Sequence, residues 1–452
     1  MIEKFFRLKE NNTSVSTEIL GGIATFMTMS YIIFVQPAVL SICGMDKGSV
    51  FTATCISSAL ATLLMGFLAN YPISLAPGMG QNFYFAFVAV PLIASKLPAH
   101  LSLNAWNIAL GAVFISGFLF IILSFFGFRE MIINAIPSSI KNAIAVGIGL
   151  LIALVGFEWG GIIEPNPNTF ITLTSFKSAS PSIYLCIFGL ILMCVLIALD
   201  IKGAILIGLV VSTIVGIFTN LIPYNGLINT SIPSINPTFF KLDIISALKL
   251  GIPSIIFVFF FLDLFDTIGT LIGVSEQAGF IDDQGKLPRA RKALFSDAAG
   301  TVIGSVLGTS TITSYIESAA GVATGARTGL ANIVTGFLFF GALYFSPLIE
   351  MIGIGISQPN GITIYPVIAP ALIIVGFMMI KNIARIEWNK PAEAISSYLT
   401  MLIMPFGFGI TEGISFGFIS YALLKSVSGQ WREVHPIMYI FAILFIIRYF
   451  IS

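Results

Sequence analysis

Apolar stretches long enough to cross a membrane recur along nearly the whole chain, and short polar stretches separate them. A helix needs about 20 predominantly apolar residues to cross about 30 Å of hydrocarbon. The pattern therefore predicts an all-α, multi-pass membrane protein with fourteen spans. We place these spans near residues 19–42, 50–70, 74–93, 104–127, 138–160, 183–200, 203–222, 251–275, 290–309, 311–325, 328–349, 363–381, 394–411 and 413–428. A further apolar run at 434–450 fits either a crossing or a helix lying along the membrane surface.

Lysine and arginine are unequally distributed between the two sets of predicted loops. With a cytoplasmic N-terminus, the inside loops hold sixteen Lys and Arg residues and the outside loops hold five. Cytoplasmic loops of membrane proteins carry an excess of these residues. We therefore expect a cytoplasmic N-terminus in a protein of the inner or plasma membrane. The first apolar run is too long for the hydrophobic part of a signal peptide, so we interpret it as the first span.

Composition narrows the function classes. Hydrophobic residues make up 57% of the 452 residues and charged residues only 10%, whereas soluble domains carry about 25% charged residues. Such a chain needs lipid around it. The net charge of +1 and the location of most aromatic residues inside apolar runs argue against a nucleic-acid partner. The four cysteines have no C-x-x-C spacing, so we expect small buried side chains and neither a metal nor another cofactor.

Two of the predicted spans contain sequences that interrupt a helix. Segment 74–93 contains SLAPGMGQN, and segment 311–325 contains TITSYIESAAG. A shift of 238 residues aligns Gly66 with Gly304 and brings these two segments into register. Broken helices at corresponding positions of two inverted halves are typical of secondary transporters and indicate a binding site near the membrane midplane. Chance similarity between apolar helices is the alternative.

Acidic residues within a predicted span are the clearest candidates for chemistry. One helical face of the eighth span combines four polar residues at i, i+3, i+4 and i+7, which are Asp263, Asp266, Thr267 and Thr270. A charge at the bilayer centre costs about 2.5–3.5 kcal/mol on insertion scales. A cap or a salt bridge to a neighbouring helix is the structural alternative, but no span carries Lys or Arg at matching depth. Gly269 and Gly273 further predict close backbone packing beside this face.

Three more polar residues lie in or near the interrupted segments. Glu317 follows the second interruption and is expected deep in the membrane, with an acid at the cytoplasmic end as the alternative. Asn82 follows the first interruption, where a ligand contact and a helix cap are equally good explanations. Asp297, in the ninth span, lies nearer the cytoplasm and is interpreted as structural.

The expected site suits one kind of ligand. Carboxylates, an amide, hydroxyls and aromatic rings match a neutral, planar molecule with several N–H donors, whereas an anion needs basic groups. The acids also offer protonatable groups for coupling, because Asp263 and Asp266 would repel each other if both were ionised. The residues therefore predict a carrier coupled to protons or to another cation.

Four motifs in order resemble one family along essentially the whole chain. TEILGGIATFMTMSYIIFVQP, APGMGQN, FFLDLFDTIGTLIG and ESAAGVATGARTGLANIVTG are similar to the AzgA-like purine permeases of the nucleobase–cation symporter-2 (xanthine/uracil permease) family. The resemblance implies a UraA-like 7+7 inverted repeat with spans 3 and 10 broken by short extended stretches. It also implies a core domain (1–127 and 246–349) that moves like an elevator past a gate domain (128–245 and 350–452). Carriers of this kind often pair through the gate domain, so a homodimer is an open expectation.

The same resemblance assigns roles and a substrate class. It implies a purine substrate, and the family's binding carboxylates correspond to Asp263, Asp266 and Glu317. From these acids we expect import of hypoxanthine, guanine or adenine by proton symport, with Asp263 or Glu317 bonding a ring N–H while another carboxylate of the trio titrates. Among the family's binding positions, the Gly and Asn after the first break correspond to Gly80 and Asn82. Gln81 departs from the family motif, which usually has a hydrophobic residue there. That departure either shifts the preference among purines or only faces the cavity.

Other functions are weighed against this one. A pyrimidine or xanthine/urate carrier of the same fold is the nearest alternative, and an anion exchanger would not need three acids. An intramembrane aspartyl protease would need a second Asp within G-x-G-D, and a serine protease would need a His within a span, both of which are absent. A channel would be separated from a carrier by saturable uptake.

Overall fold

The computed structural model describes residues 2–98, 100–126, 136–249, 253–281, 287–358 and 362–451. Within these residues, eight helical stretches are long and apolar enough to cross a membrane, against the fourteen spans predicted. They are Val15–Ser41, Lys47–Ala69, Ser102–Ser124, Ser138–Trp159, Pro181–Ala198, Ile255–Ala278, Gly329–Ile352 and Ile368–Arg385. The mostly helical, multi-pass architecture is thus confirmed.

The chain divides into two compact units, one formed by residues 1–125 and 159–371 and the other by 126–158 and 372–452. Helices of the first unit are α1 (Ile2–Phe6), α2 (Val15–Met29), α3 (Ile32–Ser41), α4 (Lys47–Leu64), α5 (Met79–Tyr84), α6 (Val90–Ser95), α7 (Ala105–Phe126), α10 (Pro181–Ala198), α11 (Ala204–Phe218), α12 (Ile244–Lys249), α13 (Pro253–Ala278), α14 (Ala290–Leu307), α15 (Ala319–Ala323), α16 (Gly329–Ala342) and α17 (Ser346–Ile352). The second unit contains α9 (Ser138–Trp159), α19 (Pro391–Phe406), α20 (Ile410–Val427) and α21 (Pro436–Ile451). Helix α18 (Ile368–Ile380) begins in the first unit and continues into the second.

Three two-stranded antiparallel sheets accompany the helices. They are β1 (Leu75–Pro77) with β4 (Ile312–Ser314), β2 (Ile163–Asn166) with β3 (Phe170–Leu173), and β5 (Ile356–Ser357) with β6 (Thr363–Ile364). The first pair joins segments far apart in sequence, because Leu75 pairs with Ser314 and Pro77 with Ile312, which are 239 and 235 residues apart. These separations lie on either side of the shift of 238 that aligns the two predicted interruptions.

The β1–β4 pair satisfies backbone groups that the interruptions release from helical bonding. The N–H of Gly78 donates to the carbonyl of Thr311, and the N–H of Tyr315 donates to the carbonyl of Ser74. The Thr62 hydroxyl donates to the carbonyl of Leu75 and accepts from its N–H. Non-helical backbone survives at membrane depth only where protein or water satisfies it. Here the protein itself supplies the partners.

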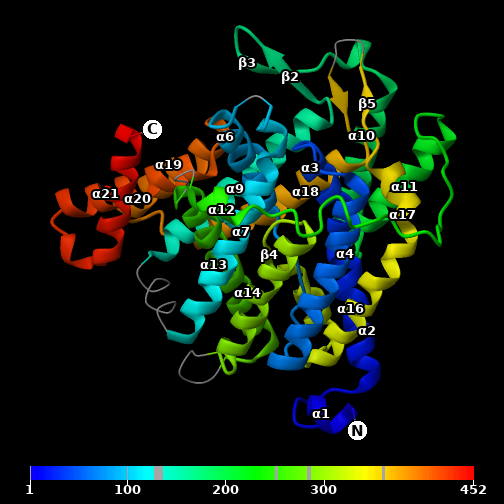
Figure 1. The fold of residues 1–452 in the computed structure, drawn as a ribbon, viewed down its shortest axis with the longest axis horizontal. Helices are drawn as coiled ribbons and strands as arrows, with labels where there is room; N and C mark the ends of the chain where they lie inside the picture. Colours follow the sequence, from blue (N-terminus) through cyan, green and yellow to red (C-terminus); the bar gives the residue numbers. More distant parts are fainter. Residues whose placement is uncertain are drawn as a thin grey trace. The chain divides into compact units, whose positions relative to one another are not determined.

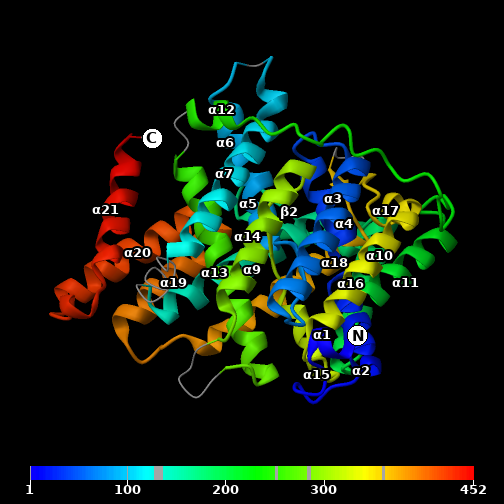
Figure 2. The ribbon, with the colours of Figure 1, turned by 60° about the horizontal axis from the view of Figure 1, so that its bottom comes forward.

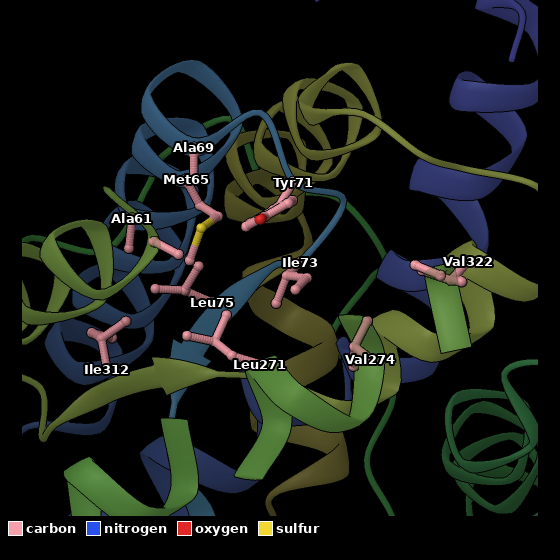
Figure 3. Close-up of a cluster of buried hydrophobic side chains, with 12 residues drawn as sticks. Ala61, Met65, Ala69, Tyr71, Ile73, Leu75, Leu271, Val274, Ile312 and Val322 are labelled. Carbon is pink, nitrogen blue, oxygen red and sulfur yellow. The ribbon is translucent and has the colours of Figure 1, made fainter. Parts of the chain in front are cut away.

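A hydrophobic cluster supports this strand pair (Figure 3). Its labelled side chains come from α4 and the turn after it, from β1, β4 and α13, and from α15. Leu75 of β1 and Ile312 of β4 are fully buried within it. The cluster fixes the two strands against α4 and α13, which brings the interrupted segments next to the acidic face of α13.

Helices α2, α4 and α16 lie side by side in both ribbon views (Figures 1 and 2). Glycines allow the close approach. A Cβ on Gly329 of α16 would overlap the carbonyl oxygen of Gly66, and a Cβ on Gly22 of α2 would overlap that of Ala331. The prediction of close packing at Gly269 of α13 is wrong, because no described heavy atom lies within 4 Å of a Cβ built there.

The predicted run at 434–450 forms helix α21, which packs on α20 within the second unit (Figure 2). Phe418 of α20 contacts Phe445 of α21 with a ring-centroid distance of 5.9 Å. The guanidinium of Arg448 lies 2.6 Å from the carboxylate of Glu412. At 1.5 Å per residue, the 16 residues of α21 extend about 24 Å, less than the hydrocarbon thickness.

Candidate functional site

The acidic face of α13 is divided by burial. Asp263 is fully buried, whereas Asp266, one turn later, is partly exposed to solvent. The hydroxyl of Thr301 on α14 donates to the Asp263 carboxylate over 3.3 Å. The sequence predicts Asp263 and Asp266 on one helical face. In the structure only Asp266 of the two is partly exposed to solvent.

The accessible acid Asp266 contacts the first interrupted segment. The side-chain Nε2 of Gln81, on α5, donates to the Asp266 carboxylate over 3.2 Å. Helix α5 begins at Met79, directly after Gly78, because the Pro77–Gly78 pair ends the strand and an extended Gly78 precedes the helix. In the sequence Gln81 stands out only as a departure from a motif, whereas in the structure it has an acidic partner.

The second accessible acid, Glu317, lies in the 3-10 turn Ile316–Ser318 that follows β4. The hydroxyl of Tyr31 donates to its carboxylate over 2.8 Å, and the hydroxyl of Thr28 donates to its backbone carbonyl over 3.2 Å. Tyr31 is 2% exposed and lies where α2 gives way to α3. Tyr31 could not be predicted from the sequence, since a tyrosine within an apolar span carries no distinguishing signal.

Asp266 and Glu317 form the centre of the candidate site. They come from α13 and from the second interrupted segment, and both are partly exposed. The hydroxyl of Tyr315, in the second interrupted segment, donates to the carbonyl of Pro77 in the first. The rings of Tyr31 and Tyr315 lie 6.5 Å apart between centroids. Two carboxylates and two phenols thus meet beside both helix interruptions.

Asn82 belongs to a buried amide and hydroxyl network. The hydroxyl of Ser310 donates to Oδ1 of Asn82, and Nε2 of Gln36 donates to the hydroxyls of Thr309 and Ser310 over 2.9 and 3.1 Å. Nδ2 of Asn82 is buried without a hydrogen-bond partner within the described part of the chain. Gly80 is buried in the same helix α5.

The two predicted threonines of α13 face different surroundings from Asp266. The hydroxyl of Thr267 donates to Asp297 over 2.7 Å and lies 2.9 Å from the hydroxyl of Thr313, while Thr270 is 6% exposed. Ser314 also donates to Asp297, over 2.9 Å. Asp297 is fully buried and joins α13 to β4 from α14. The structure therefore brings Thr267 into a supporting network behind the accessible acids.

The site offers hydrogen-bond acceptors and aromatic faces, but no group of three or more His, Cys, Asp or Glu side chains gathers as a metal site among the residues described. Accessible carboxylates suit a ligand with N–H donors, and neighbouring phenols suit a planar ring. The arrangement can bind and release such a molecule, and its acids can hold a proton.

Comparison with known proteins gives relatives along the full chain. The profile of the Permease family, Xan_ur_permease, matches residues 16–416. A putative permease of Methanocaldococcus jannaschii is 46% identical, over 99% of this chain and 98% of that protein. The guanine/hypoxanthine permease PbuG of Bacillus subtilis is 43% identical, over 100% and 99%. The adenine permease AdeP of Escherichia coli is 39% identical, over 99% and 96%.

Solved structures show a similar fold at low sequence identity. The transmembrane domain of the cyanobacterial bicarbonate transporter BicA superposes with a TM-score of 0.64 at 15% identity, covering 88% of this chain and 97% of that one. At this identity the similarity concerns the fold alone.

Proposed function

Because the chain belongs to the xanthine/uracil permease family, we propose that it imports purine nucleobases across the cell's inner or plasma membrane by proton symport. Hypoxanthine, guanine and adenine are the candidate substrates. The family consists of transporters and not of enzymes, so the protease alternative is excluded. The observation that carries the proposal is the place of two partly exposed acids: Asp266 accepts from Gln81 of the first interrupted segment, and Glu317 belongs to the second.

In this proposal Asp266 binds the substrate. Its carboxylate is partly exposed and accepts a hydrogen bond from a neutral amide, Gln81. An ionised carboxylate is a strong acceptor for a purine ring N–H. The buried rings of Tyr31 and Tyr315 lie 6.5 Å apart, and the Tyr31 hydroxyl bonds Glu317, so aromatic side chains surround the second acid of the site. Asn82, Gly80 and Thr270 complete the proposed lining of the site.

Glu317 carries the coupling proton in this proposal. Two neighbouring carboxylates repel each other when both are ionised, so one of the pair favours a proton. Glu317 interacts with Asp266 and hydrogen-bonds the Tyr31 hydroxyl, which can donate to the ionised acid. Asp263, fully buried behind Asp266, has a supporting role in place of the direct role first expected.

The proposed mechanism includes fourteen spans in two inverted halves, with the third and tenth interrupted at β1 and β4. We propose that a core of residues 1–127 and 246–349 carries the substrate past a gate of residues 128–245 and 350–452, in an elevator-like movement. The proposal also includes a cytoplasmic N-terminus, surrounding lipid, and pairing of two copies through the gate.

Uptake of radiolabelled hypoxanthine, guanine and adenine into membrane vesicles tests the proposal. An imposed gradient, acidic on the outer face, should raise both the initial rate and the final accumulation of at least one purine. A protonophore should abolish the increase. Purine uptake with the same rate and accumulation with and without the pH gradient would contradict proton symport. Absence of purine uptake would contradict the substrate class.

A further inference from the structure

Gln81 is a buried polar residue whose role the proposed function leaves open. It lies in the first turn of α5 and is 1% exposed. A buried amide in an apolar protein costs free energy unless its donors and acceptors are satisfied. Its presence beside Asp266 therefore calls for a specific partner.

Only one half of the Gln81 carboxamide has such a partner. Nε2 donates to Oδ2 of Asp266 over 3.2 Å. Oε1 is buried and accepts no hydrogen bond from any residue that the structure describes. Leaving a buried acceptor unsatisfied costs about 1–3 kcal/mol. A ligand that supplies an N–H group there would remove this cost.

The backbone provides a fixed place for this carboxamide. A Cβ on Gly78 would overlap Oε1 of Gln81 and would lie 2.6 Å from the side-chain methyl of Thr313. The carboxamide therefore lies over a position that only glycine leaves open, between the first break and β4. A side chain at position 78 would have to displace the Gln81 carboxamide, whose hydrogen bond to Asp266 fixes its orientation.

The hydrogen bond to Asp266 determines which atom of the Gln81 side chain remains to bind a ligand. Because Nε2 is engaged with the carboxylate, the carboxamide presents its oxygen as an acceptor. Asp266 is itself an acceptor, so the two side chains together form a pair of neighbouring acceptors. Their complement is a ligand edge with two neighbouring N–H donors.

We propose that Gln81 is a specificity-determining residue that, with Asp266, selects a purine whose ring N–H is flanked by an exocyclic amine. Guanine has this edge, in its N1–H and 2-amino group. Hypoxanthine has the ring N–H without the amine, and in adenine the amine lies beside a ring nitrogen that accepts. The inference rests on the proposed function and specifies its substrate.

Competition between purines tests this inference. Radiolabelled hypoxanthine uptake is measured with increasing unlabelled guanine for the wild type, Gln81→Met and Gln81→Leu. Methionine keeps the length of the side chain and removes both hydrogen-bonding atoms. Gln277→Met makes the same change at an exposed position of α13 and serves as the control. The amount of each variant in the membrane is measured in parallel.

The wild type and the Gln277→Met control should bind guanine about tenfold more tightly than hypoxanthine, as one additional satisfied hydrogen bond provides. Gln81→Met should bring the two affinities together, with the guanine affinity falling and the hypoxanthine affinity staying within about twofold. An undiminished guanine preference in Gln81→Met, or no preference in the wild type, would overturn the inference. Equal loss of both substrates in both Gln81 variants, with normal protein levels, would also overturn it. Wild-type protein that takes up neither purine would instead refute the proposed function.

Discussion

The hydroxyl of Tyr31 donates a 2.8 Å hydrogen bond to Oε1 of Glu317, a residue 286 positions later in the chain. The contact joins the start of α3 to the second interrupted segment. Thr28 strengthens the same junction through the Glu317 backbone carbonyl. The position of a candidate coupling acid is therefore set by the first membrane segment as well as by its own.

Removing the Tyr31 hydroxyl should weaken the site without unfolding it. In Tyr31→Phe, Glu317 loses a donor to its carboxylate while the buried ring stays in place. We expect KM for the transported purine to rise about tenfold, because one hydrogen bond to a charged group is lost. Tyr344→Phe, at an exposed position, is the control. A KM equal to that of the wild type would show that the Tyr31–Glu317 bond does not shape the site.

The two aspartates of α13 should behave differently when neutralised. Asp266→Asn removes an accessible carboxylate, so purine binding should be lost while the protein remains folded. Asp263→Asn changes a fully buried carboxylate that accepts from Thr301, so it should lower thermal stability and leave purine binding detectable. Binding of radiolabelled purine to the purified variants, with Tm measured in detergent, distinguishes them. Loss of purine binding in Asp263→Asn at unchanged Tm would show that Asp263 takes a direct part in binding.

The sequence predicts relationships within one helix of this site, but not contacts between segments far apart in the chain. Spacing places Asp263 and Asp266 on one helical face, and the Pro and Gly residues of APGMG predict a break near β1. Spacing alone cannot say which acid reaches solvent, because burial depends on Thr301 and α14 packing behind Asp263. Local pattern likewise carries no information about partners far away in sequence.

Two further residues illustrate that limit. Tyr31 lies in an apolar span, and only the folded chain reveals its bond to Glu317. Asp297 has the structural surroundings expected of it, but only the folded chain reveals its partners Thr267 and Ser314. At Gly269 the sequence predicts close packing that the described residues do not show. A glycine in a helix permits close packing, but whether another backbone passes beside it depends on the fold.

Glu18 should be important for stability, although nothing in the sequence around it indicates this. This fully buried carboxylate of α2 accepts from the backbone N–H groups of Arg327, Thr328 and Ala331 at the start of α16. Glu18→Ala should destabilise the protein by about 2 kcal/mol or more, because buried donors lose a charged acceptor. A lower Tm in detergent measures the effect, and the exposed Glu3→Ala is the control. Equal Tm values for the two variants would contradict the capping role.

Two glycines of α16 provide a matched test of helix packing. A Cβ on Gly329 would overlap the Gly66 carbonyl oxygen, whereas a Cβ on Gly341 meets nothing within 4 Å among the described residues. Gly329→Ala should therefore lower Tm and the amount of folded protein, since backbone cannot yield as a flexible side chain does. Gly341→Ala should be neutral or should stabilise by up to about 1 kcal/mol, as alanine favours a helix. The reverse order of stability would contradict the described contact between α16 and the Met65–Ala69 turn that follows α4.

The central claim is that a purine and a proton share the Asp266–Glu317 pair, and proton movement driven by purine tests it most directly. Purified protein in vesicles containing a pH-sensitive dye is exposed to external guanine or hypoxanthine. We predict that purine addition acidifies the vesicle interior for the wild type. Glu317→Gln, which keeps the shape of the side chain, should still exchange labelled for unlabelled purine without moving protons. Acidification by Glu317→Gln at the wild-type rate, or purine uptake by the wild type without proton movement, would contradict the account.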